Sequence, residues 1–521
     1  MQSLDITHSL QNLLLESSID STQSRHLILL SFLAKNNPLR VSEIENQKPS
    51  NNPLNYLMRF QEIFNLELLN HSELEIISLN QSAQNIWLKT PECDLNDFFT
   101  IAENIFEHIS NADIQKKTGS FYTPPKVVEL ILNLDTAKLS PDNSRKVLDP
   151  SCGAGIFLRS YLAKSGNKPE QRLKTIKKLY GIDLNLNAIK LCRFLLQIKC
   201  FENFDDTISI QNLPNLSTNI IQANALMETK LFSGDKFDLI LANPPFGLSR
   251  DQQIEAKEKK LLKEMYCETF PGKQNKYLLF IKKITDLMTK EGEAIIITPN
   301  SWLGIDSGKK LRQELVEKRL LCTINSFKNK LFPDLGVETI ILQLKKQFNN
   351  SLSICKYSDL SRKPKLATLP YKVIKHSETY QIPLIWESKF TNIFETISDS
   401  SLPLAKHPAQ LTPSIALQAY AAGKGTPKQD KNASRNKVFH SKEKSSATHY
   451  PYLAGKDLSD YQINWSGNYL NYGPWLAEHQ PIERYTSPRV IIREVLGKAP
   501  YLIKSCYTED SYTYNLSLIH I

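Results

Sequence analysis

An apolar run followed directly by two prolines is the first feature of this sequence that could do chemistry. The stretch FDLILANPPF places Asn243, Pro244, Pro245 and Phe246 after a run that is typical of a buried parallel strand. Open α/β sheets place their chemistry at the carboxyl ends of strands, where Asn243 would lie. The prolines fix φ and remove two N–H donors, which leaves backbone carbonyl oxygens as acceptors. We predict a rigid cluster of acceptors beside an aromatic ring; a plain proline turn is the alternative.

A glycine turn between a strand and a helix forms a second group of interest. KVLDPSCGAGIFLRSYL places Asp149 at a strand end, and Gly153 and Gly155 permit positive φ and a close approach of the backbone to a ligand. The third glycine of the dinucleotide fingerprint and the lysine of a phosphate-binding loop are missing. On its own, this turn favours a structural role and a nucleotide-binding role equally.

Two more strand ends carry side chains that suit a nucleoside. Asp183 ends the strand in YGIDLN and could accept both ribose hydroxyls or cap the following helix. Asn224, in NIIQANAL, could contact an adenine edge or lie in a plain loop. Upstream, Thr123 precedes Pro124 and Pro125 at the expected start of a helix, where it is a natural N-cap. The order of these signals predicts a nucleoside-binding rim.

Size and composition indicate which elements position these residues. The 521 residues are 41% hydrophobic and 23% charged, which is typical of a globular protein with several domains. The formal charge of +10 suits a nucleic-acid partner. The eight cysteines form no C-x-x-C pair, so we expect no disulfide framework, no zinc site and no other metal. The apolar run LILLSFLA is too short to span a membrane and no signal peptide is evident, so we expect a cytoplasmic location.

Strands alternate with helical stretches over residues 101–350, which predicts a doubly wound, Rossmann-like α/β domain. Residues 1–100 are expected to be largely helical. Residues 351–408 are interpreted as a connecting segment, and residues 409–521 as a mixed α/β domain rich in tyrosine and lysine. The expected strands of the α/β domain are KVLDP, KLYGIDL, NIIQANAL, FDLILANPP, GEAIIITPN and ETIILQLKK.

Taken in order, the motifs of this domain resemble a known family. TGSFYTPP, DPSCGAGIFL, GIDLN, NPPF, KYLLFIKKI, GEAIIITPNSWL and LFPDLGVETIIL are similar to those of S-adenosylmethionine-dependent DNA adenine-N6 methyltransferases of the restriction–modification type. The resemblance covers residues 100–350 and implies S-adenosylmethionine as the cofactor and double-stranded DNA as the substrate. HYPYLAGKDLSDYQINWSGNYLNYG and SPRVIIREV resemble, more loosely, the target-recognition (DNA specificity) domain of this family.

The resemblance implies a cofactor site that runs from the methionine end to the adenine end of S-adenosylmethionine. Its residues would be, in that order, Thr123, Asp149, Gly153, Gly155, Asp183, Asn224 and Phe280. Thr123 would contact the methionine part, Asp183 the ribose and Asn224 the adenine, with Phe280 packing on the adenine ring. Many relatives carry aspartate at the position of Asn224, so this sequence departs from the family pattern at the adenine contact.

The resemblance also gives NPPF a function. The side-chain oxygen of Asn243 and the carbonyl of Pro244 would accept both hydrogens of the exocyclic amine of adenine, so that its lone pair points at the sulfonium methyl. The base must first be flipped out of the duplex. Phe246, where relatives often have tyrosine, would stack on the base, and Phe332 would clamp it or be an ordinary core residue.

Other functions and partners stay open. A methyltransferase that acts on protein glutamine, one that acts on RNA, and a catalytically inactive DNA-binding specificity subunit are the alternatives. A restriction endonuclease encoded separately is an expected partner. Between Gly423 and Lys444, seven basic and two acidic side chains could follow a phosphate backbone or form a solvated, flexible loop. The final LSLIHI resembles translated sequencing-adapter sequence, so we expect a truncated target-recognition domain.

Overall fold

The chain folds into two compact units, Met1–Glu395 and Thr396–Ile521. The computed structural model describes residues 21–37, 39, 54–66, 68, 86, 88–93, 95–109, 123–136, 145–202, 204, 208–228, 231–246, 256–269, 275–332, 337–346, 350–402, 414–493, 503–514 and 518–520. Among these residues, no helix combines the length and the apolar character needed to cross a membrane.

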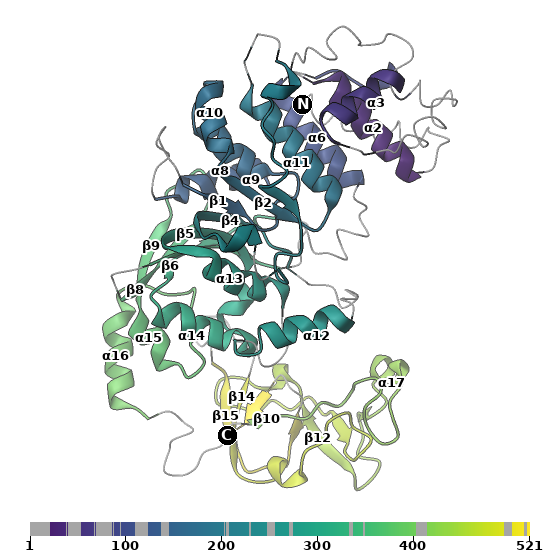
Figure 1. Ribbon diagram of the computed structural model, residues 1–521. Coiled ribbons are helices and arrows are strands. Elements are labelled where there is room, and N and C mark those ends of the chain that lie inside the picture. Colours follow the sequence, from purple (N-terminus) through teal and green to yellow (C-terminus); the bar gives the residue numbers. More distant parts are fainter. Residues whose placement is uncertain are drawn as a thin grey trace. The chain divides into compact units, whose positions relative to one another are not determined.

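A nine-stranded sheet forms the centre of the first unit (Figure 1). Its strands are β1 (Val147–Asp149), β2 (Leu179–Asp183), β3 (Ile220–Gln222), β4 (Phe237–Ala242), β5 (Met288–Pro299), β6 (Leu321–Phe327), β7 (Thr339–Lys345), β8 (Ser351–Tyr357) and β9 (Lys365–Pro370). Their order is β3-β2-β1-β4-β5-β7-β6-β8-β9. The pairs from β3 to β5 are parallel, whereas β7 is antiparallel to both of its neighbours. All six strands expected from the sequence are present, as β1–β5 and β7.

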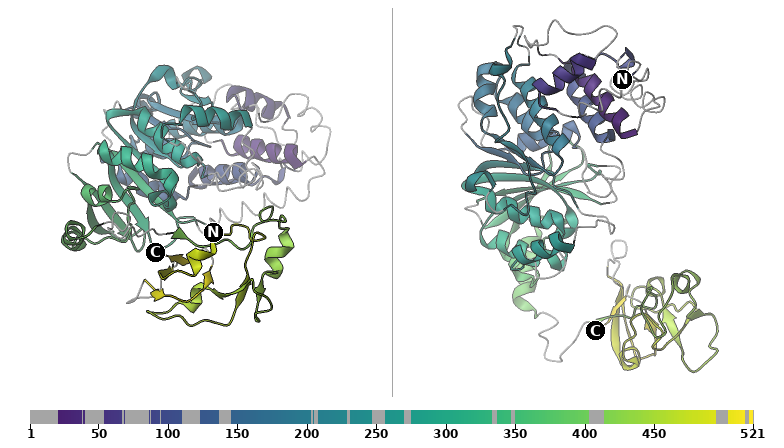
Figure 2. Two further views of the ribbon diagram at one scale, coloured as in Figure 1. Left: turned by 90° about the horizontal axis from the view of Figure 1, so that it is seen from below. Right: turned by 45° about the vertical axis from the view of Figure 1, so that its right-hand side comes forward.

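Helices cover both faces of this sheet (Figure 2), which confirms the predicted Rossmann-like class. On one face lie α8 (Pro125–Leu134), α9 (Ile156–Lys164), α10 (Pro169–Ile176) and α11 (Leu186–Cys200), and on the other lie α13 (Lys276–Leu287) and α14 (Lys309–Glu317). A further helix, α12 (Ala256–Met265), precedes α13. Because the central strands are covered on both sides, they are almost entirely apolar: residues 292–299 of β5 are all buried.

The described part of the amino-terminal region is mainly helical, as predicted, and shares its core with the α/β domain. Its main described helices are α2 (Ser21–Lys35), α3 (Leu54–Ile63) and α6 (Leu95–Ile109). Phe60 of α3 and Phe64, which directly follows α3, pack edge-on against Phe194 of α11, with ring centroids 5.6 and 4.8 Å from that ring. A buried ion pair of 2.8 Å joins Glu103 of α6 to Arg159 of α9. The helices are therefore part of the body that carries the glycine turn.

The prediction of a connecting segment over residues 351–408 is wrong for the described residues 351–402; residues 403–408 lie outside the described residues. β8 and β9 extend the sheet, and α15 (Tyr371–His376) and α16 (Phe390–Ser400) follow them. β8 alternates buried and partly exposed residues and β9 lies at the sheet edge, so neither has the continuous apolar run of a central strand. Pro364 and Pro370 flank or end β9, where a proline is tolerated, and they made the segment look like a loop.

The second unit contains two four-stranded sheets, ordered β10-β17-β14-β15 and β11-β13-β12-β16. Its elements are β10 (Ser414–Ile415), α17 (Lys431–Asn436), β11 (His440–Ser441), β12 (His449–Leu453), β13 (Tyr469–Asn471), β14 (Arg489–Arg493), β15 (Ser505–Thr508), β16 (Thr513–Tyr514) and β17 (Leu518–His520). Many of its tyrosines build its own core; the rings of Tyr485 and Tyr514, for example, pack edge-on at 5.1 Å. Beyond the end of α16, which the unit boundary divides, the described residues of the unit are mostly β, with α17 as a short α-helix.

Candidate active site

The strand order puts the candidate residues at the switch point of the sheet. From β1 the chain proceeds to β2 and β3 on one side, and it later returns to β4 and β5 on the other. In such a sheet, ligands bind outside the carboxyl ends of the two strands where the direction reverses. The glycine turn follows β1, and NPPF follows β4, which pairs directly with β1 (Figure 1). The structure therefore brings the two motifs to one edge of the sheet.

Asn243 is held by a side chain that lies 120 positions earlier in the sequence. Its Nδ2 donates a hydrogen bond of 3.1 Å to Oγ1 of Thr123, which is 3% exposed. This bond fixes the plane of the amide and leaves its oxygen on the other edge of the group. Thr123 is not the N-cap of α8, contrary to one reading of the sequence: Pro124 occupies that position, and Pro125 is the first helical residue. The Thr123 hydroxyl serves the NPPF motif instead.

The two glycines of the turn after β1 have different tasks. Gly153 and Gly155 both have positive φ, of 50° and 89°. A Cβ placed on Gly153 would meet nothing within 4 Å, so this position faces open space. A Cβ on Gly155 would lie 2.5 Å from Sγ of Cys192, a buried residue of α11. Gly155 allows α9 and α11 to pack closely, whereas Gly153 leaves room beside its backbone for a ligand.

We expect Gly155→Ala to lower the free energy of unfolding by about 2–4 kcal/mol, because strain at positive φ adds to overpacking against Cys192. Gly153→Ala introduces only the strain, about 1 kcal/mol. Urea unfolding of both variants, and of Gly155→Ala combined with Cys192→Ala, measures the coupling between positions 155 and 192. Equal losses at Gly153 and Gly155, with no coupling to Cys192, would contradict the packing role.

Asp183 links the glycine turn to the end of β2. Its Oδ2 accepts a hydrogen bond of 2.9 Å from the Gly153 N–H, and its Oδ1 accepts one of 2.8 Å from the Asn185 N–H. Asn185, rather than Asp183, is the N-cap of α11. Burial raises the pKa of Asp183, and the backbone hydrogen bonds from Asn185, Gly153 and Leu184 oppose this rise. Three backbone donors leave about one of the four lone-pair sites of the carboxylate, so Asp183 retains acceptor capacity for a ligand at the rim.

Asp149 is a buried carboxyl group at the end of β1. It is 1% exposed, and its Oδ1 accepts a hydrogen bond of 3.0 Å from the Ser151 N–H. Burial raises the pKa of Asp149 to about 8; the bond from Ser151 opposes the rise and the charge of Asp183 adds to it. The Ser151 hydroxyl is itself buried without a hydrogen-bond partner. A cationic or hydroxyl-bearing ligand beside Gly153 would offset both of these unfavourable features.

This pKa predicts how stability depends on pH. An unfolded aspartate has a pKa of about 3.9, so between about pH 4 and pH 8 the folded protein keeps a proton that the unfolded chain has lost. The contribution of Asp149 is fully present below about pH 4 and is lost as pH rises through about 8. Relative to Asp149→Asn, the wild type should lose up to about 1.4 kcal/mol of unfolding free energy per pH unit in this window. A difference between the two proteins that does not change with pH, measured by urea unfolding from pH 5 to 8, would contradict the assignment.

Asn224 follows β3, and Phe280, which is buried, lies on α13. The Asn224 side-chain oxygen accepts a hydrogen bond of 3.1 Å from the Leu226 N–H, so it stabilises its own turn. Lys283 of α13 donates a hydrogen bond of 2.5 Å to the Glu228 carbonyl of the same turn. Phe280 is one helical turn before Lys283 and therefore on the same side of α13. A planar ligand bound at this turn would therefore lie on the side of α13 that carries the Phe280 ring.

The two phenylalanines expected to hold a base are both buried. Phe246 is 1% exposed and Phe332 is 6% exposed, and both belong to the main hydrophobic core. Asn243 and Pro245, in contrast, are partly exposed. Side chains that cover Phe246 must therefore move before a base can stack on its ring. The described state of NPPF thus offers hydrogen-bonding groups but no open aromatic face.

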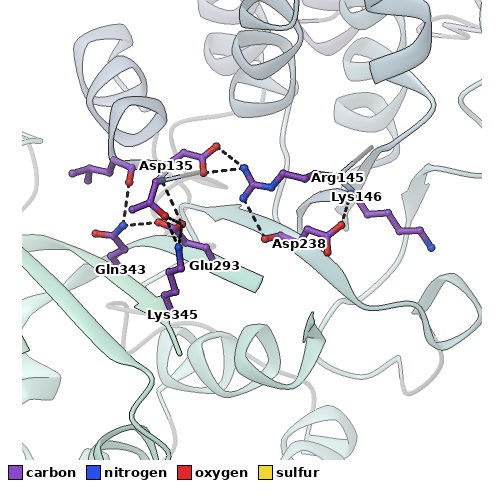
Figure 3. A network of polar contacts seen from close by, with 9 residues as sticks. Asp135, Arg145, Lys146, Asp238, Glu293, Gln343 and Lys345 are labelled. Carbon is purple, nitrogen blue, oxygen red and sulfur yellow. Dashed lines mark hydrogen bonds and ion pairs between the residues drawn. The ribbon is translucent and has the colours of Figure 1, made fainter. Parts of the chain in front are cut away.

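The opposite edge of the sheet carries a polar network with a structural role (Figure 3). Arg145, just before β1, binds Asp135 through bonds of 2.9 and 2.8 Å, and Asp238 of β4 accepts a bond of 2.9 Å from the Lys146 N–H. Glu293 of β5 accepts from Thr136 and Gln343. These groups lie at the amino ends of β1 and β4, away from the candidate site, and they lock the starts of the strands together.

Sequence reasoning missed two contributors to this site. Ser151 was not singled out, although it lies between Asp149 and Gly153 in the motif itself, and that position was a usable signal. Cys192 supports Gly155 from a helix 37 positions away, and no local pattern marks it. Beneath the turn, Cys192 and Cys152 are both buried and free. The Cys192 thiol fills the space that a Cβ at position 155 would need, whereas the Cys152 thiol, from within the turn, lies against Gly181 of β2.

The chain matches the family model of the N-6 DNA methylases over residues 96–375, more than half of its length. Among curated proteins it is similar to the type II restriction enzyme and methyltransferase RM.Eco57I of Escherichia coli, with 29% identity over 49% of this chain and 31% of that protein. It is also similar to the type II methyltransferase M.BstVI of Geobacillus stearothermophilus, with 30% identity over 38% of this chain and 36% of that protein. The chain thus spans less than half the length of these relatives.

Solved structures of low sequence identity share the fold. The DrdV–DNA complex matches with a TM-score of 0.57 at 12% identity, over 100% of this chain and 61% of that chain. A nuclease-deletion mutant of the type ISP restriction–modification enzyme LlaGI, in complex with a DNA substrate mimic, matches with a TM-score of 0.56 at 13% identity, over 100% and 51%. Together with the family match and the Rossmann-like sheet, these findings establish that the chain belongs to the N-6 DNA methylase family of restriction–modification methyltransferases.

Proposed function

We propose that this protein is a site-specific DNA methyltransferase that transfers a methyl group from S-adenosylmethionine to the N6 amine of a flipped-out adenine, as the modification activity of a restriction–modification system. One observation carries most of this proposal. Asn243 lies just beyond the end of β4, its amide is fixed by Thr123, and β4 pairs with the strand that bears the glycine turn. Asn243, which would orient the amine, therefore lies next to the strand end that carries the proposed nucleoside site.

The residues around the glycine turn fit a cofactor of this kind. Gly153 faces open space, Asp149 is a buried acid beside an unpartnered Ser151 hydroxyl, and Asp183 keeps acceptor capacity. A sulfonium or ammonium group would favour the charged form of Asp149, and ribose hydroxyls suit Asp183. Asn224 and Phe280 would surround the adenine ring. S-adenosylmethionine, when bound, supplies an electrophilic methyl group.

Asn243 and Pro244 act on the amine that receives the methyl group. In adenine this nitrogen is a poor nucleophile because its lone pair is delocalised into the ring. Two acceptors, the Asn243 amide oxygen and the Pro244 carbonyl, would hold both N–H hydrogens and let the nitrogen become pyramidal. Pro244 and Pro245 contribute no N–H donor that could compete for these oxygens. Orientation and fixed dipoles supply the rate enhancement.

The target base has to leave the duplex before it can reach Asn243. Flipping costs a few kcal/mol, and stacking on an aromatic ring offsets about 1–3 kcal/mol of it. We propose that the extruded base displaces the cover of Phe246 and stacks there, with Phe332 closing over it. The burial of both rings means that this step includes a local rearrangement.

Partners and compartment follow from the same proposal. Double-stranded DNA is the substrate, and residues 409–521 of the second unit form the target-recognition module. A restriction endonuclease is the expected partner, because the methyl group would protect host DNA from its cleavage. The endonuclease is encoded separately in some restriction–modification systems and lies in the same chain in others. The eight free cysteines suit a reducing bacterial or archaeal cytoplasm.

A methyl-transfer assay tests this proposal. S-adenosylmethionine with a radiolabelled methyl group is offered in parallel with duplex DNA, RNA and protein. We expect label in duplex DNA, recovered as N6-methyladenine on nucleoside analysis. Label in RNA or in protein glutamine would instead identify one of the two rival methyltransferases. DNA binding without any transfer would indicate an inactive specificity subunit.

A further inference from the structure

A basic segment of the second unit is built as a fixed element. Residues 423–444, here called the α17 projection, contain α17 and lie at the end of the unit away from β14 and β15 (Figure 1). Gln429, 8% exposed, anchors its base: Nε2 donates to the Ala419 and Trp475 carbonyls at 2.9 and 2.7 Å, and Oε1 accepts from the Ala421 N–H at 3.0 Å. A solvated, flexible loop would lack such an anchor, so the order of this segment needs another explanation.

The charges of the projection are largely unbalanced within the unit. Seven basic side chains face two acidic ones, Asp430 and Glu443. The Asp430 carboxylate caps α17 by accepting a hydrogen bond of 2.8 Å from the Ala433 N–H. Within the described part of the chain, Lys424 has an ion-pair partner, Glu478, whereas Lys428, Lys431, Arg435, Lys437 and Lys444 are exposed and have none. Exposed cations held on a rigid element form a surface that attracts a polyanion.

A pocket of about 520 Å³ opens beside this helix. Its walls include the amides Asn432 and Asn436, the rings Phe439 and Trp475 and the cation Lys428, together with Gln429, the helix-capping Asp430 and the apolar Pro427, Ala433 and Val438. Asn432 and Asn436 are four residues apart and therefore share one face of α17. The Trp475 indole N–H is already bonded to the Asn471 carbonyl at 2.9 Å, so its ring is fixed in place. Amides that can read a base edge lie next to rings and a cation that suit a nucleotide.

We propose that the α17 projection and its pocket are a DNA-reading site, in which Asn432 and Asn436 contact base edges while Lys428, Lys431 and Arg435 contact the flanking phosphates. The inference rests on the proposed function, and it adds the residues that select the sequence. The proposal also gives the side chains of α17 two different roles, contact with phosphates and contact with base edges. Loss of a phosphate contact weakens binding to every sequence, whereas loss of a base contact weakens binding to the recognised sequence alone.

The phosphate contacts are tested with Lys431→Ala combined with Arg435→Ala in the full chain. The probe is duplex DNA that carries the sequence methylated by the wild type, identified by sequencing methylated bases in a host that expresses it. We expect the slope of log affinity against log salt to become shallower by about 0.9 for each side chain, with about tenfold or more weaker binding at 0.1 M salt. Lys174→Ala combined with Lys177→Ala removes the same charge from exposed positions at α10, and it should change neither value.

The base contacts are tested with Asn432→Ala combined with Asn436→Ala. We expect the ratio of affinities for the methylated sequence and for a scrambled duplex to fall about 5- to 150-fold, with the salt slope unchanged. All four substituted positions are exposed, so thermal unfolding should match the wild type. This match separates a lost contact from a damaged fold.

The outcomes separate the two proposals. If the wild type methylates DNA but both double variants bind and discriminate as it does, this inference fails and the proposed function stands. If the lysine and arginine variant alone changes, the base-reading role of Asn432 and Asn436 is overturned. If the wild type neither methylates nor binds duplex DNA, the proposed function fails and the inference fails with it.

Discussion

Replacement of Asn243 by alanine is expected to lower the rate of methyl transfer to DNA by about 10²–10³-fold or more, the loss typical of removing one preorganised hydrogen-bonding group. The side chain supplies one of the two acceptors for the amine, and Thr123 holds it in place. Asn243 does not belong to the proposed cofactor rim. The dissociation constant for S-adenosylmethionine, measured by titration calorimetry, should therefore stay within about threefold of the wild type, which is well under 1.4 kcal/mol.

Asn215→Ala is the matched control for this experiment. Asn215 is an exposed asparagine in the turn before β3, and its Oδ1 accepts a hydrogen bond of 2.9 Å from the Ser217 N–H. It lies at the amino edge of the sheet, so its loss should leave the rate unchanged. Parental methylation by Asn243→Ala, or an equal loss in both variants, would show that the amide has no part in the chemistry.

Replacement of Asp183 by alanine is expected to weaken S-adenosylmethionine binding by about 100-fold or more. The carboxylate would lose its contacts with the ribose, and the Gly153 and Asn185 N–H groups would lose the acceptor that fixes the glycine turn. A charged acceptor that bonds neutral donors contributes about 1.5–3 kcal/mol for each bond, which agrees with a loss of this size. Titration calorimetry measures the affinity, and transfer at saturating cofactor separates binding from the chemical step.

Asp235→Ala provides the comparison for Asp183. Asp235 precedes β4 at the amino edge of the sheet and forms an ion pair of 2.7 Å with Lys146. Its replacement removes the same charge and one polar contact without reaching the site. Cofactor affinity should then be unchanged, because partly exposed pairs contribute little. If Asp183→Ala bound the cofactor as tightly as Asp235→Ala, the rim would have to be sought elsewhere.

Strand ends and glycine turns were predictable because their signals are local. Five parallel strands carry continuous apolar runs, and each run stops at a polar residue or a proline, so the positions of Asp149, Asp183 and Asn243 followed from the sequence. Doubly wound topology then brings these strand ends to one edge. The match between local pattern and final fold explains why the candidate site could be outlined before its geometry was available.

Partners distant in sequence were not predictable. Local reasoning gave Thr123 a capping role, but its hydroxyl bonds Asn243, and Pro124 takes the cap. The reason that position 155 must be glycine is likewise the Sγ of Cys192, a tertiary contact. β8 and β9 were missed because half-exposed edge strands with nearby prolines resemble loops. In each of these cases tertiary packing decides the outcome, and no single-sequence pattern encodes it.

An experimental structure of the protein with S-adenosylhomocysteine and its DNA sequence measures the central geometry most directly. The proposed mechanism predicts an adenine outside the helix, with N6 about 3 Å from both the Asn243 Oδ1 and the Pro244 carbonyl, and its ring against Phe246. The sulfur of the bound product should lie on the side of N6 that faces Asp149 and Asp183. A base that stays stacked in the duplex, or one extruded into a hollow that Asn243 does not reach, would contradict it.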